Sequence, residues 1–231
     1  MTVPSPPRGF FVTGTDTGVG KTVASVAMIQ FLRGAGLRAV GMKPVASGCE
    51  HTPGGWRNDD ALRLQAASVP RPAYDDVNPY ALELATAPQL AARAMGMRVE
   101  LAQLNDAYAR LAAQADAIVV EGVGGWAAPL DEGLEQSDLA RNLDLSVVLV
   151  VGLRLGCLSH ARLTARAIEH DGLSLAGWIG NSVDPAFAER DQYVDLLREA
   201  LPSPCLGLLP HTESPDAAAM ASFLSLPPGF S

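Results

Sequence analysis

The segment Phe10–Thr22 reads FFVTGTDTGVGKT and indicates how the chain folds. Its first four residues are apolar or β-branched, as is typical of a buried strand. The loop that follows contains three glycines and ends in Gly-Lys-Thr, and residues Lys21–Arg33 have the pattern of a helix. A strand, a glycine-rich loop and a helix in this order form a setting in which backbone N–H groups bind phosphate.

The residue types in this loop predict nucleotide binding. We expect Lys21 to bridge the β- and γ-phosphates and the Thr22 hydroxyl to hold Mg²⁺. The spacing departs from the strict motif, because five residues separate Gly14 from Gly20 and Thr15 takes the place of the first motif glycine. The alternative is a glycine-rich turn that carries an exposed lysine. A dinucleotide site is not expected, since the third glycine of GxGxxG is missing.

Short apolar runs alternate with longer helix-like segments along the rest of the chain. Such runs are typical of parallel strands that are covered on both faces, so we predict an α/β fold: a doubly wound, mostly parallel sheet with helices on both faces. Expected strands are Gly9–Thr13, Arg38–Lys43, Ala117–Glu121, Ser146–Val151, Leu175–Asn181 and Cys205–Leu209. Expected helices after Lys21–Arg33 are Asp59–Ala67, Ala87–Met95, Glu100–Gln114, Ser159–His170 and Pro185–Ala200.

The domain prediction is simple. We expect a disordered tail at residues 1–8 and one domain at residues 9–231, with a long loop at Cys49–Arg57. The first eight residues contain three prolines and no apolar core, so a signal peptide is not expected.

Composition excludes several classes of protein. With 231 residues, 48% of them hydrophobic, the chain can build a substantial core. A net charge of -8 without any basic run argues against nucleic-acid binding, and no apolar stretch is long enough to span a membrane. The three cysteines are an odd number without CxxC spacing, which favours reduced thiols and a cytoplasmic location over disulfides or zinc.

Charged residues follow two of the predicted strands. Glu121 ends the strand Ala117–Glu121, and Lys43 ends another, so both are expected at the ligand-binding edge of the sheet. Glu121 is expected to serve Mg²⁺, or else to be held by its own glycine turn. Lys43 either stabilises negative charge during transfer or is a surface lysine. Asp59 and Asp60 are first interpreted as acidic residues at a helix N-terminus.

At this point the sequence resembles the dethiobiotin synthetases, the ATP-dependent ring-closing enzymes of biotin synthesis. The resemblance runs from Phe10 to about Pro210. It rests on an ordered set of segments: residues 12–17, 19–22, 43–48, 57–58, 60–62, 77–80, 121–122, 124–126, 155–157, 160–161 and 176–178.

The resemblance implies a P-loop NTPase-like fold, a cytoplasmic homodimer and a specific reaction. An amine of 7,8-diaminononanoate captures CO₂, supplied as CO₂ or bicarbonate, as a carbamate. ATP phosphorylates the carbamate, and the second amine closes the ureido ring, giving dethiobiotin, ADP and phosphate. By this resemblance Lys43 and Lys21 are the catalytic residues, and Lys43 holds the carbamate.

The resemblance also implies the binding residues. It assigns the metal to Thr22, Asp60 and Glu121. It assigns the nucleotide to Gly18, Val19, Gly20, Lys21, Thr22, Val23, Asp60, Glu121, Gly122, Val123, Gly124, Asn181, Ser182, Leu209, Pro210 and His211. It assigns the other substrate to Thr17, Lys43 and Ser47 and, for the carboxylate tail across a dimer interface, to Gly156, Cys157 and Ser159. Gly18, Ser159 and His211 replace the Glu, Asn and Trp of a well-known relative.

Three other functions compete with this one. A nucleotide-switched ATPase of the partitioning or regulatory type would carry a further lysine early in the loop, and Thr15–Val19 contains none. A cobalamin-pathway amidating synthetase would need a glutamine-hydrolysing domain, for which 231 residues leave no room. A regulatory pseudo-enzyme without turnover is disfavoured by the presence of Lys21, Thr22, Lys43, Asp60 and Glu121.

Overall fold

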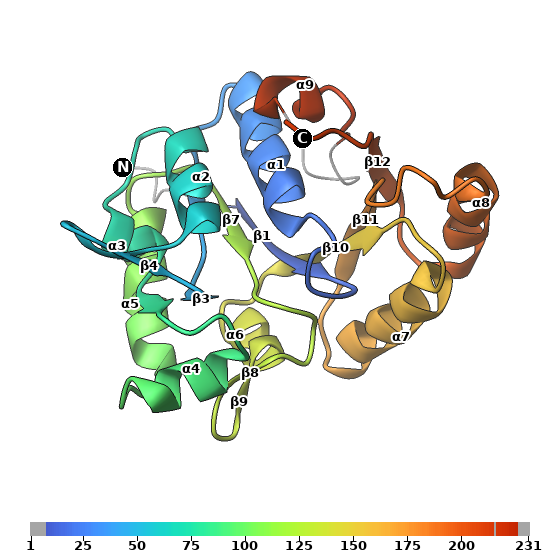
Figure 1. Ribbon diagram of the computed structural model, residues 1–231. Coiled ribbons are helices and arrows are strands. Elements are labelled where there is room, and N and C mark those ends of the chain that lie inside the picture. The colour runs from blue at the N-terminus through green and yellow to red at the C-terminus, as the bar shows by residue number, and fades with distance from the viewer. Residues whose placement is uncertain (1–7, 215, 226–231) are drawn as a thin grey trace.

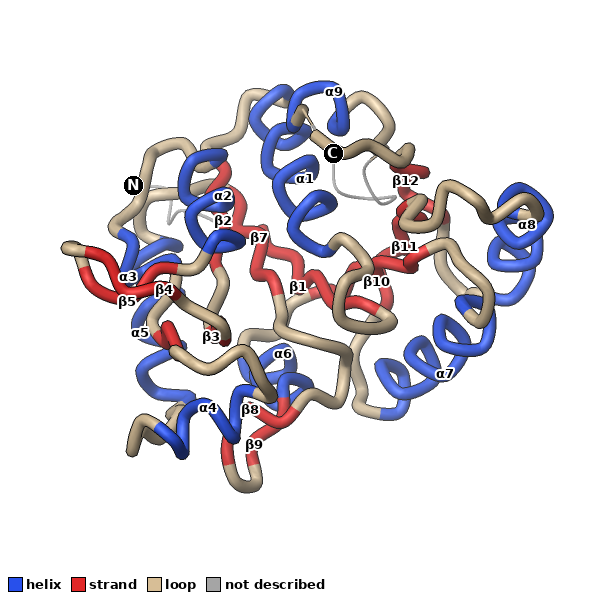
Figure 2. The backbone as a smooth tube through the Cα atoms, viewed as in Figure 1, coloured by secondary structure: helices blue, strands red, loops and turns tan. Residues whose placement is uncertain are grey.

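The computed structural model describes residues 8–214 and 216–225. Its centre is a six-stranded, fully parallel sheet that carries helices on both faces (Figures 1 and 2). In sheet order the strands are β12 (Cys205–Leu209), β11 (Leu175–Asn181), β10 (Ser146–Gly152), β1 (Arg8–Gly14), β7 (Ala117–Glu121) and β2 (Ala39–Met42). The predicted fold class is confirmed.

Helices and short strands surround this sheet. The helices are α1 (Lys21–Gly34), α2 (Asp59–Ala67), α3 (Tyr74–Val77), α4 (Pro88–Ala94), α5 (Leu101–Ala112), α6 (Gln136–Asn142), α7 (Cys157–His170), α8 (Arg190–Ala200) and α9 (Ala217–Ala221). The short strands pair as β3 (Val45–Ser47) with β6 (Tyr80–Leu82), β4 (Glu50–Thr52) with β5 (Gly55–Arg57), and β8 (Pro129–Asp131) with β9 (Leu134–Glu135).

Alternate residues of β1 point to opposite faces of the sheet. Phe10 and Val12 pack in one apolar cluster with α1, α2 and α9, whereas Phe11 packs in a second cluster with α4, α5 and α6. Helices α7 and α8 pack against β10 and β11 in a third cluster. Because β1 is buried from both sides, its carboxyl end and the loop that follows rest on a rigid support.

The position of β1 creates the ligand-binding edge. The strand lies between β10 and β7, and the chain runs out to β2 before it returns to β7. The strand order therefore reverses next to β1, and an open parallel sheet binds ligands in the crevice at such a reversal.

Several sequence-based boundaries are wrong. Residues Cys49–Arg57 form the β4–β5 hairpin and not a long loop, because Gly55 turns the chain with φ 98° and Thr52 Oγ1 donates to its carbonyl at 2.8 Å. Helix α8 begins at Arg190 and not at Pro185, since Asp184 accepts from the Ala186 N–H in a separate turn. Helix α7 begins at Cys157, two residues before the predicted start.

Of the predicted tail, residues 1–7 lie outside the described residues, and Arg8 is the first residue of β1. Among the described residues, no helix is both long and apolar enough to cross a membrane.

Candidate phosphate-binding and transfer site

Glycine at position 20 allows the loop between β1 and α1 to pack tightly against its neighbours. Gly20 precedes α1 with φ 86°, a left-handed conformation that favours glycine. A Cβ at this position would overlap the Asn181 side chain, whose Nδ2 donates to the Val19 carbonyl at 3.0 Å. The end of β11 thus holds the loop in place, and the N-terminus of α1 faces the crevice.

Lys21 connects this loop to the glycine turn after β7. Its ammonium donates to the carbonyl of Asp16 at 3.0 Å and to that of Gly124 at 2.7 Å. Burial lowers the pKa of Lys21 from 10.5 to about 8, and the positive charge of Lys43 contributes to the shift. Lys21 therefore sits where a cation lacks water and gains from an anionic ligand.

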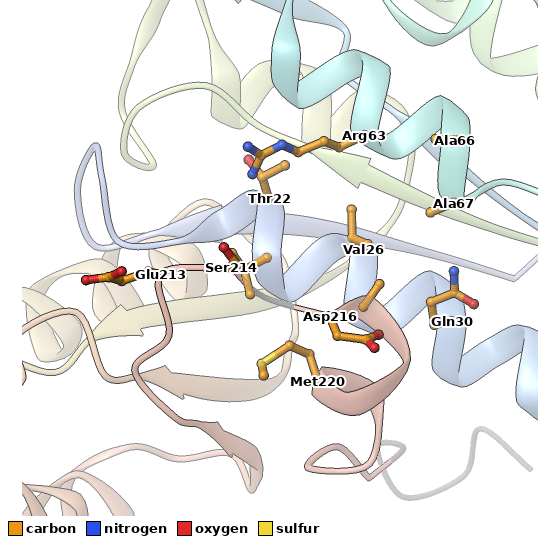
Figure 3. A pocket seen from close by; sticks show the side chains of 12 residues that line it. Thr22, Val26, Gln30, Arg63, Ala66, Ala67, Glu213, Ser214, Asp216 and Met220 are labelled. Carbon is orange, nitrogen blue, oxygen red and sulfur yellow. The ribbon is translucent and has the colours of Figure 1, made fainter.

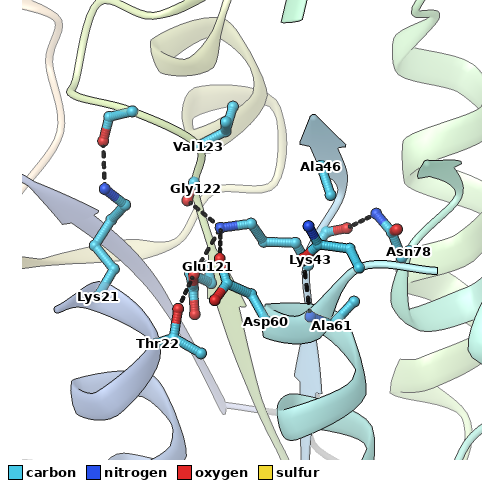
Figure 4. A network of polar contacts seen from close by, with 12 residues as sticks. Lys21, Thr22, Lys43, Ala46, Asp60, Ala61, Asn78, Glu121, Gly122 and Val123 are labelled. Atoms are coloured by element: carbon cyan, nitrogen blue, oxygen red, sulfur yellow. Dashed lines mark hydrogen bonds and ion pairs between the residues drawn. The ribbon is translucent and has the colours of Figure 1, made fainter. Parts of the chain in front are cut away.

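Four side chains form one polar network at the carboxyl ends of β2 and β7 (Figure 4). Glu121 Oε1 accepts from Lys43 Nζ at 2.6 Å and from Thr22 Oγ1 at 2.9 Å. Lys43 Nζ also lies 3.4 Å from Asp60 Oδ2 and donates to the Gly122 carbonyl at 3.1 Å. The predicted lysine, acids and threonine thus meet although they are far apart in the sequence.

Lys43 is a buried ion and not a surface lysine. The residue is 4% exposed and follows β2 directly, because the strand ends at Met42 and not at Lys43 as predicted. Burial alone would lower its pKa, but attraction by Glu121 and Asp60 outweighs burial and raises the pKa. Lys43 therefore stays protonated and can stabilise negative charge at neutral pH.

The acidic groups fit a hard divalent cation. Glu121 is fully buried, and its Oε2 atom has no hydrogen-bond partner. No group of three His, Cys, Asp or Glu side chains in the described part of the chain could hold a metal alone. Two carboxylates and the Thr22 hydroxyl match Mg²⁺, which usually keeps waters and phosphate oxygens as its other ligands. The residues present therefore fit the predicted ion.

One cleft of about 380 Å³ collects most of the predicted site residues. The predicted residues that line it are Thr17, Gly18, Gly20, Lys21, Thr22, Val23, Lys43, Ser47, Asp60, Glu121, Val123 and Gly124. Val19 and Gly122 do not line it, but their carbonyls accept the bonds from Asn181 and Lys43 described above. The phosphate loop, the metal candidates and the predicted substrate residues Thr17, Lys43 and Ser47 thus share one space.

The predicted adenine residues lie at the ends of β11 and β12. The Ser182 N–H donates to the Leu209 carbonyl at 3.0 Å, and His211 Nδ1 lies 3.1 Å from the Ser182 carbonyl. Asn181 is buried beneath the phosphate loop. These residues are brought together beside the cleft, and Pro210 stands between Leu209 and His211 in the same turn.

The predicted residues for the carboxylate tail form a separate group. Gly156 precedes α7 with φ 93°, Cys157 is the buried first residue of the helix, and Ser159 is exposed. None of the three lines the cleft. The neighbouring Arg154 pairs with Asp16 of the phosphate loop at 2.9 Å, so this helix end touches the site through one ion pair.

Sequence reasoning missed two amides that position the site. Gln136 accepts from the Val123 N–H at 2.5 Å and donates to the Gly125 carbonyl at 2.9 Å and to Thr13 Oγ1 at 3.1 Å. Asn78 Nδ2 donates to the Lys43 carbonyl at 2.7 Å. Asn78 lies in one of the segments on which the resemblance rests, whereas Gln136 belongs to none of them.

Trp126 fixes the far end of the glycine turn. It is 4% exposed, and its Nε1 donates to Asp171 at 2.7 Å. Asp171 is the residue directly after α7. The turn after β7 is therefore tied both to α6 through Gln136 and to the end of α7.

The fold and the site together define a P-loop nucleotide-binding α/β protein. Residues 8–219 match the family model described as an AAA domain. The receptor FtsY of the signal recognition particle from Elizabethkingia anophelis, solved with GDP, superposes with a TM-score of 0.51 at 15% identity. It covers 98% of this chain, and this chain spans 62% of it, so the likeness concerns the fold alone.

Full-length relatives define the family more narrowly. The protein is 57% identical over 221 residues to an ATP-dependent dethiobiotin synthetase BioD from Xanthomonas oryzae, a match that covers 96% of this chain and 99% of the relative. It is 58% identical over 202 residues to the BioD of Xylella fastidiosa, covering 87% and 89%. The chain belongs to the family of ATP-dependent dethiobiotin synthetases, and the resemblance seen in the sequence is confirmed.

Proposed function

We propose that the protein closes the ureido ring of dethiobiotin from 7,8-diaminononanoate, CO₂ and ATP, with Lys43 and Lys21 as its catalytic residues. As a family member it is an ATP-dependent ligase of biotin biosynthesis. The observation that carries the site assignment is the buried Lys43 ammonium in one cleft with Lys21, Thr22 and Ser47. The relatives give no support to a nucleotide-switched ATPase without turnover.

In this reaction the protein has to neutralise the negative charges of the substrates, and it does not need to form a covalent bond to them. A carbamate and a triphosphate are both anionic, and an oxygen of the carbamate attacks the γ-phosphorus as the bond to ADP breaks. The second amine then attacks the carbonyl carbon, which releases phosphate and closes the ring. No covalent protein intermediate is required, and preorganised cations can supply most of the stabilisation.

Each side chain has a defined task in this scheme. Lys21 holds the β- and γ-phosphates, and the N-terminus of α1 adds its partial positive charge. Lys43 holds the carbamate and the charge transferred to it, while Thr17 and Ser47 contact the substrate. Thr22, Asp60 and Glu121 would hold Mg²⁺, which when bound neutralises phosphate charge.

The proposal also assigns residues to the adenine of ATP and to the carboxylate tail of diaminononanoate. Asn181, Ser182 and Leu209–His211 contact the adenine. Gly156, Cys157 and Ser159 bind the carboxylate tail of the diaminononanoate across the interface of a homodimer, because the N-terminus of α7 offers free N–H groups to an anion. The three free cysteines support a cytoplasmic location.

Phosphate release from ATP tests the function directly. The purified protein is assayed with and without diaminononanoate and with and without bicarbonate. We expect release that depends on both additions, together with dethiobiotin as a product detected by mass spectrometry. Release that neither addition stimulates would instead identify a nucleotide switch.

A further inference from the structure

A groove adjoins the cleft on the side away from Lys43. It has a volume of about 570 Å³ and lies between α1, α2 and the segment that leads into α9 (Figure 3). Thr22, Val23 and Arg63 line both the groove and the cleft. The two hollows therefore meet at these three residues.

The order of residues along α2 follows the path from one hollow to the other. Asp60 lines only the cleft, Arg63 lines both hollows, and Ala66 and Ala67 line only the groove. Helix α1 repeats this order, with Lys21 in the cleft and Val26 in the groove. Glu213 and Ser214, which line the groove, follow the predicted adenine residue His211 by two and three positions. A nucleotide that binds its terminal phosphates at Lys21 and extends toward this segment passes the junction.

Arg63 is the positively charged residue that lines both hollows at this junction. It is exposed, and in the described part of the chain it has no hydrogen bond or ion pair. The other charged residues that line the cleft are two lysines and two carboxylates, whose charges cancel, and the groove adds the carboxylates of Glu213 and Asp216. Figure 3 shows the Arg63 side chain extending from α2 toward Thr22.

We propose that Arg63 binds the phosphate chain of the nucleotide between its terminal phosphoryl group and its nucleoside. A guanidinium group suits this task because its planar donors match two phosphate oxygens at once. Arg63 lies one helical turn beyond Asp60, away from Lys43, so its contact is with phosphates that remain on ADP. This inference rests on the proposed function only in placing the nucleotide in the cleft.

The test compares nucleotide binding by Arg63→Ala, Arg63→Lys and the unchanged protein. Calorimetry with Mg·ATP, Mg·ADP and adenosine needs neither diaminononanoate nor bicarbonate. We expect Arg63→Ala to weaken ATP and ADP binding alike by about tenfold, the effect of losing one hydrogen bond between charged groups. Adenosine binding is expected to stay the same, and Arg63→Lys should recover part of the loss.

A matched control separates a local contact from the loss of net charge. Arg93 is exposed on α4, outside both hollows, and Arg93→Ala removes the same charge. We expect this variant to bind ATP like the unchanged protein, and all variants to unfold at similar temperatures. An equal loss in Arg93→Ala would overturn the inference.

Two further results would also overturn it. One is unchanged ATP and ADP affinity in Arg63→Ala. The other is a loss confined to kcat, which would place Arg63 on the transferred phosphoryl group. A different result would contradict the proposed function: a protein that binds Mg·ATP but releases no phosphate in response to the amine and bicarbonate. A protein that binds no nucleotide at all would refute both.

Discussion

The two halves of the ligand-binding edge are built differently. At β1, β2 and β7, charged groups contact one another, with the buried Lys43 and Glu121 and the partly exposed Asp60 in one network. At β11 and β12 most contacts are backbone bonds and neutral side chains, such as the Ser182 N–H to the Leu209 carbonyl, and the charged Arg190 donates there to the neutral Ser182 hydroxyl, at 3.3 Å. The first half is therefore suited to stabilising charge during transfer, and the second to recognising an uncharged base.

The largest effect on activity is expected from replacing Lys43, which lies in the charged half of the edge. We expect Lys43→Met to reduce kcat by about 10²- to 10³-fold, as loss of one preorganised charge at a transfer site does. Nucleotide affinity should change little, because Lys21 and the loop remain. Steady-state kinetics and calorimetry check the two parts. Turnover within a few-fold of the original would remove Lys43 from the chemistry.

The same variant needs a control for folding. Removing one partner of a buried ion pair costs about 3–5 kcal/mol, since Glu121 would be left buried without its cation. The double variant Lys43→Met/Glu121→Gln removes both charges, so it should unfold at a higher temperature than Lys43→Met alone. Thermal unfolding of the two proteins measures this difference.

Thr22 tests the metal assignment within the charged half. Thr22→Val keeps the shape of the side chain but removes the hydroxyl that contacts Glu121. We expect the Mg²⁺ concentration for half-maximal activity to rise by about tenfold or more, the range seen when support of a metal site is lost. An unchanged Mg²⁺ titration would exclude Thr22 from the metal site.

The pKa of Lys21 predicts a pH dependence of nucleotide binding. In the free protein this pKa is lowered to about 8, and bound phosphates raise it, so binding is coupled to proton uptake above pH 8. The Kd for Mg·ATP should therefore rise, by at most about tenfold per pH unit. Calorimetry between pH 7 and 9 measures it, and Lys21→Arg, charged throughout, should show a flatter profile.

The effect of pH on folding has the opposite sign. Between about 8 and 10.5 the unfolded chain binds more protons at Lys21 than the folded chain does. This residue therefore makes the free energy of unfolding rise with pH in that window. The deprotonation of Lys21 above pH 8 is thus expected to weaken ATP binding without lowering the free energy of unfolding.

The smallest effect on activity is expected from a substitution in the other half of the edge, at β11 and β12. We expect His211→Ala to raise the KM for ATP by less than about fivefold, since a neutral hydrogen bond contributes about 1 kcal/mol. The Mg²⁺ titration should not move. A large fall in kcat with unchanged KM would contradict the division of the edge into a transfer half and a recognition half.

The sequence predicted the sheet and the charged half well, for a physical reason. Buried parallel strands are continuous apolar runs, and Lys43 or Glu121 at the end of such a run is conspicuous because charge is rare there. Strand ends meet at one edge, so the network could be expected without knowing any distance.

The parts that could not be predicted depend on contacts between distant residues. Gln136 makes two hydrogen bonds to the glycine turn and one to Thr13 of β1. It is one of several polar residues in a seven-residue helix, so no local pattern singles it out. The β4–β5 hairpin lacks apolar alternation and so resembled a loop. The role of Arg63 appears only when α1 and α2 are placed side by side.

Helix α7 is attached to the two glycine-rich loops by its opposite ends, and the two attachments are unequal. At its start, Arg154 and Asp16 form an ion pair whose side chains are 42% and 50% exposed, a contact that contributes at most about 1 kcal/mol. At its finish, the buried Trp126 holds Asp171. Of the two polar contacts, the one that reaches the phosphate loop is therefore the weaker and the more easily screened by salt.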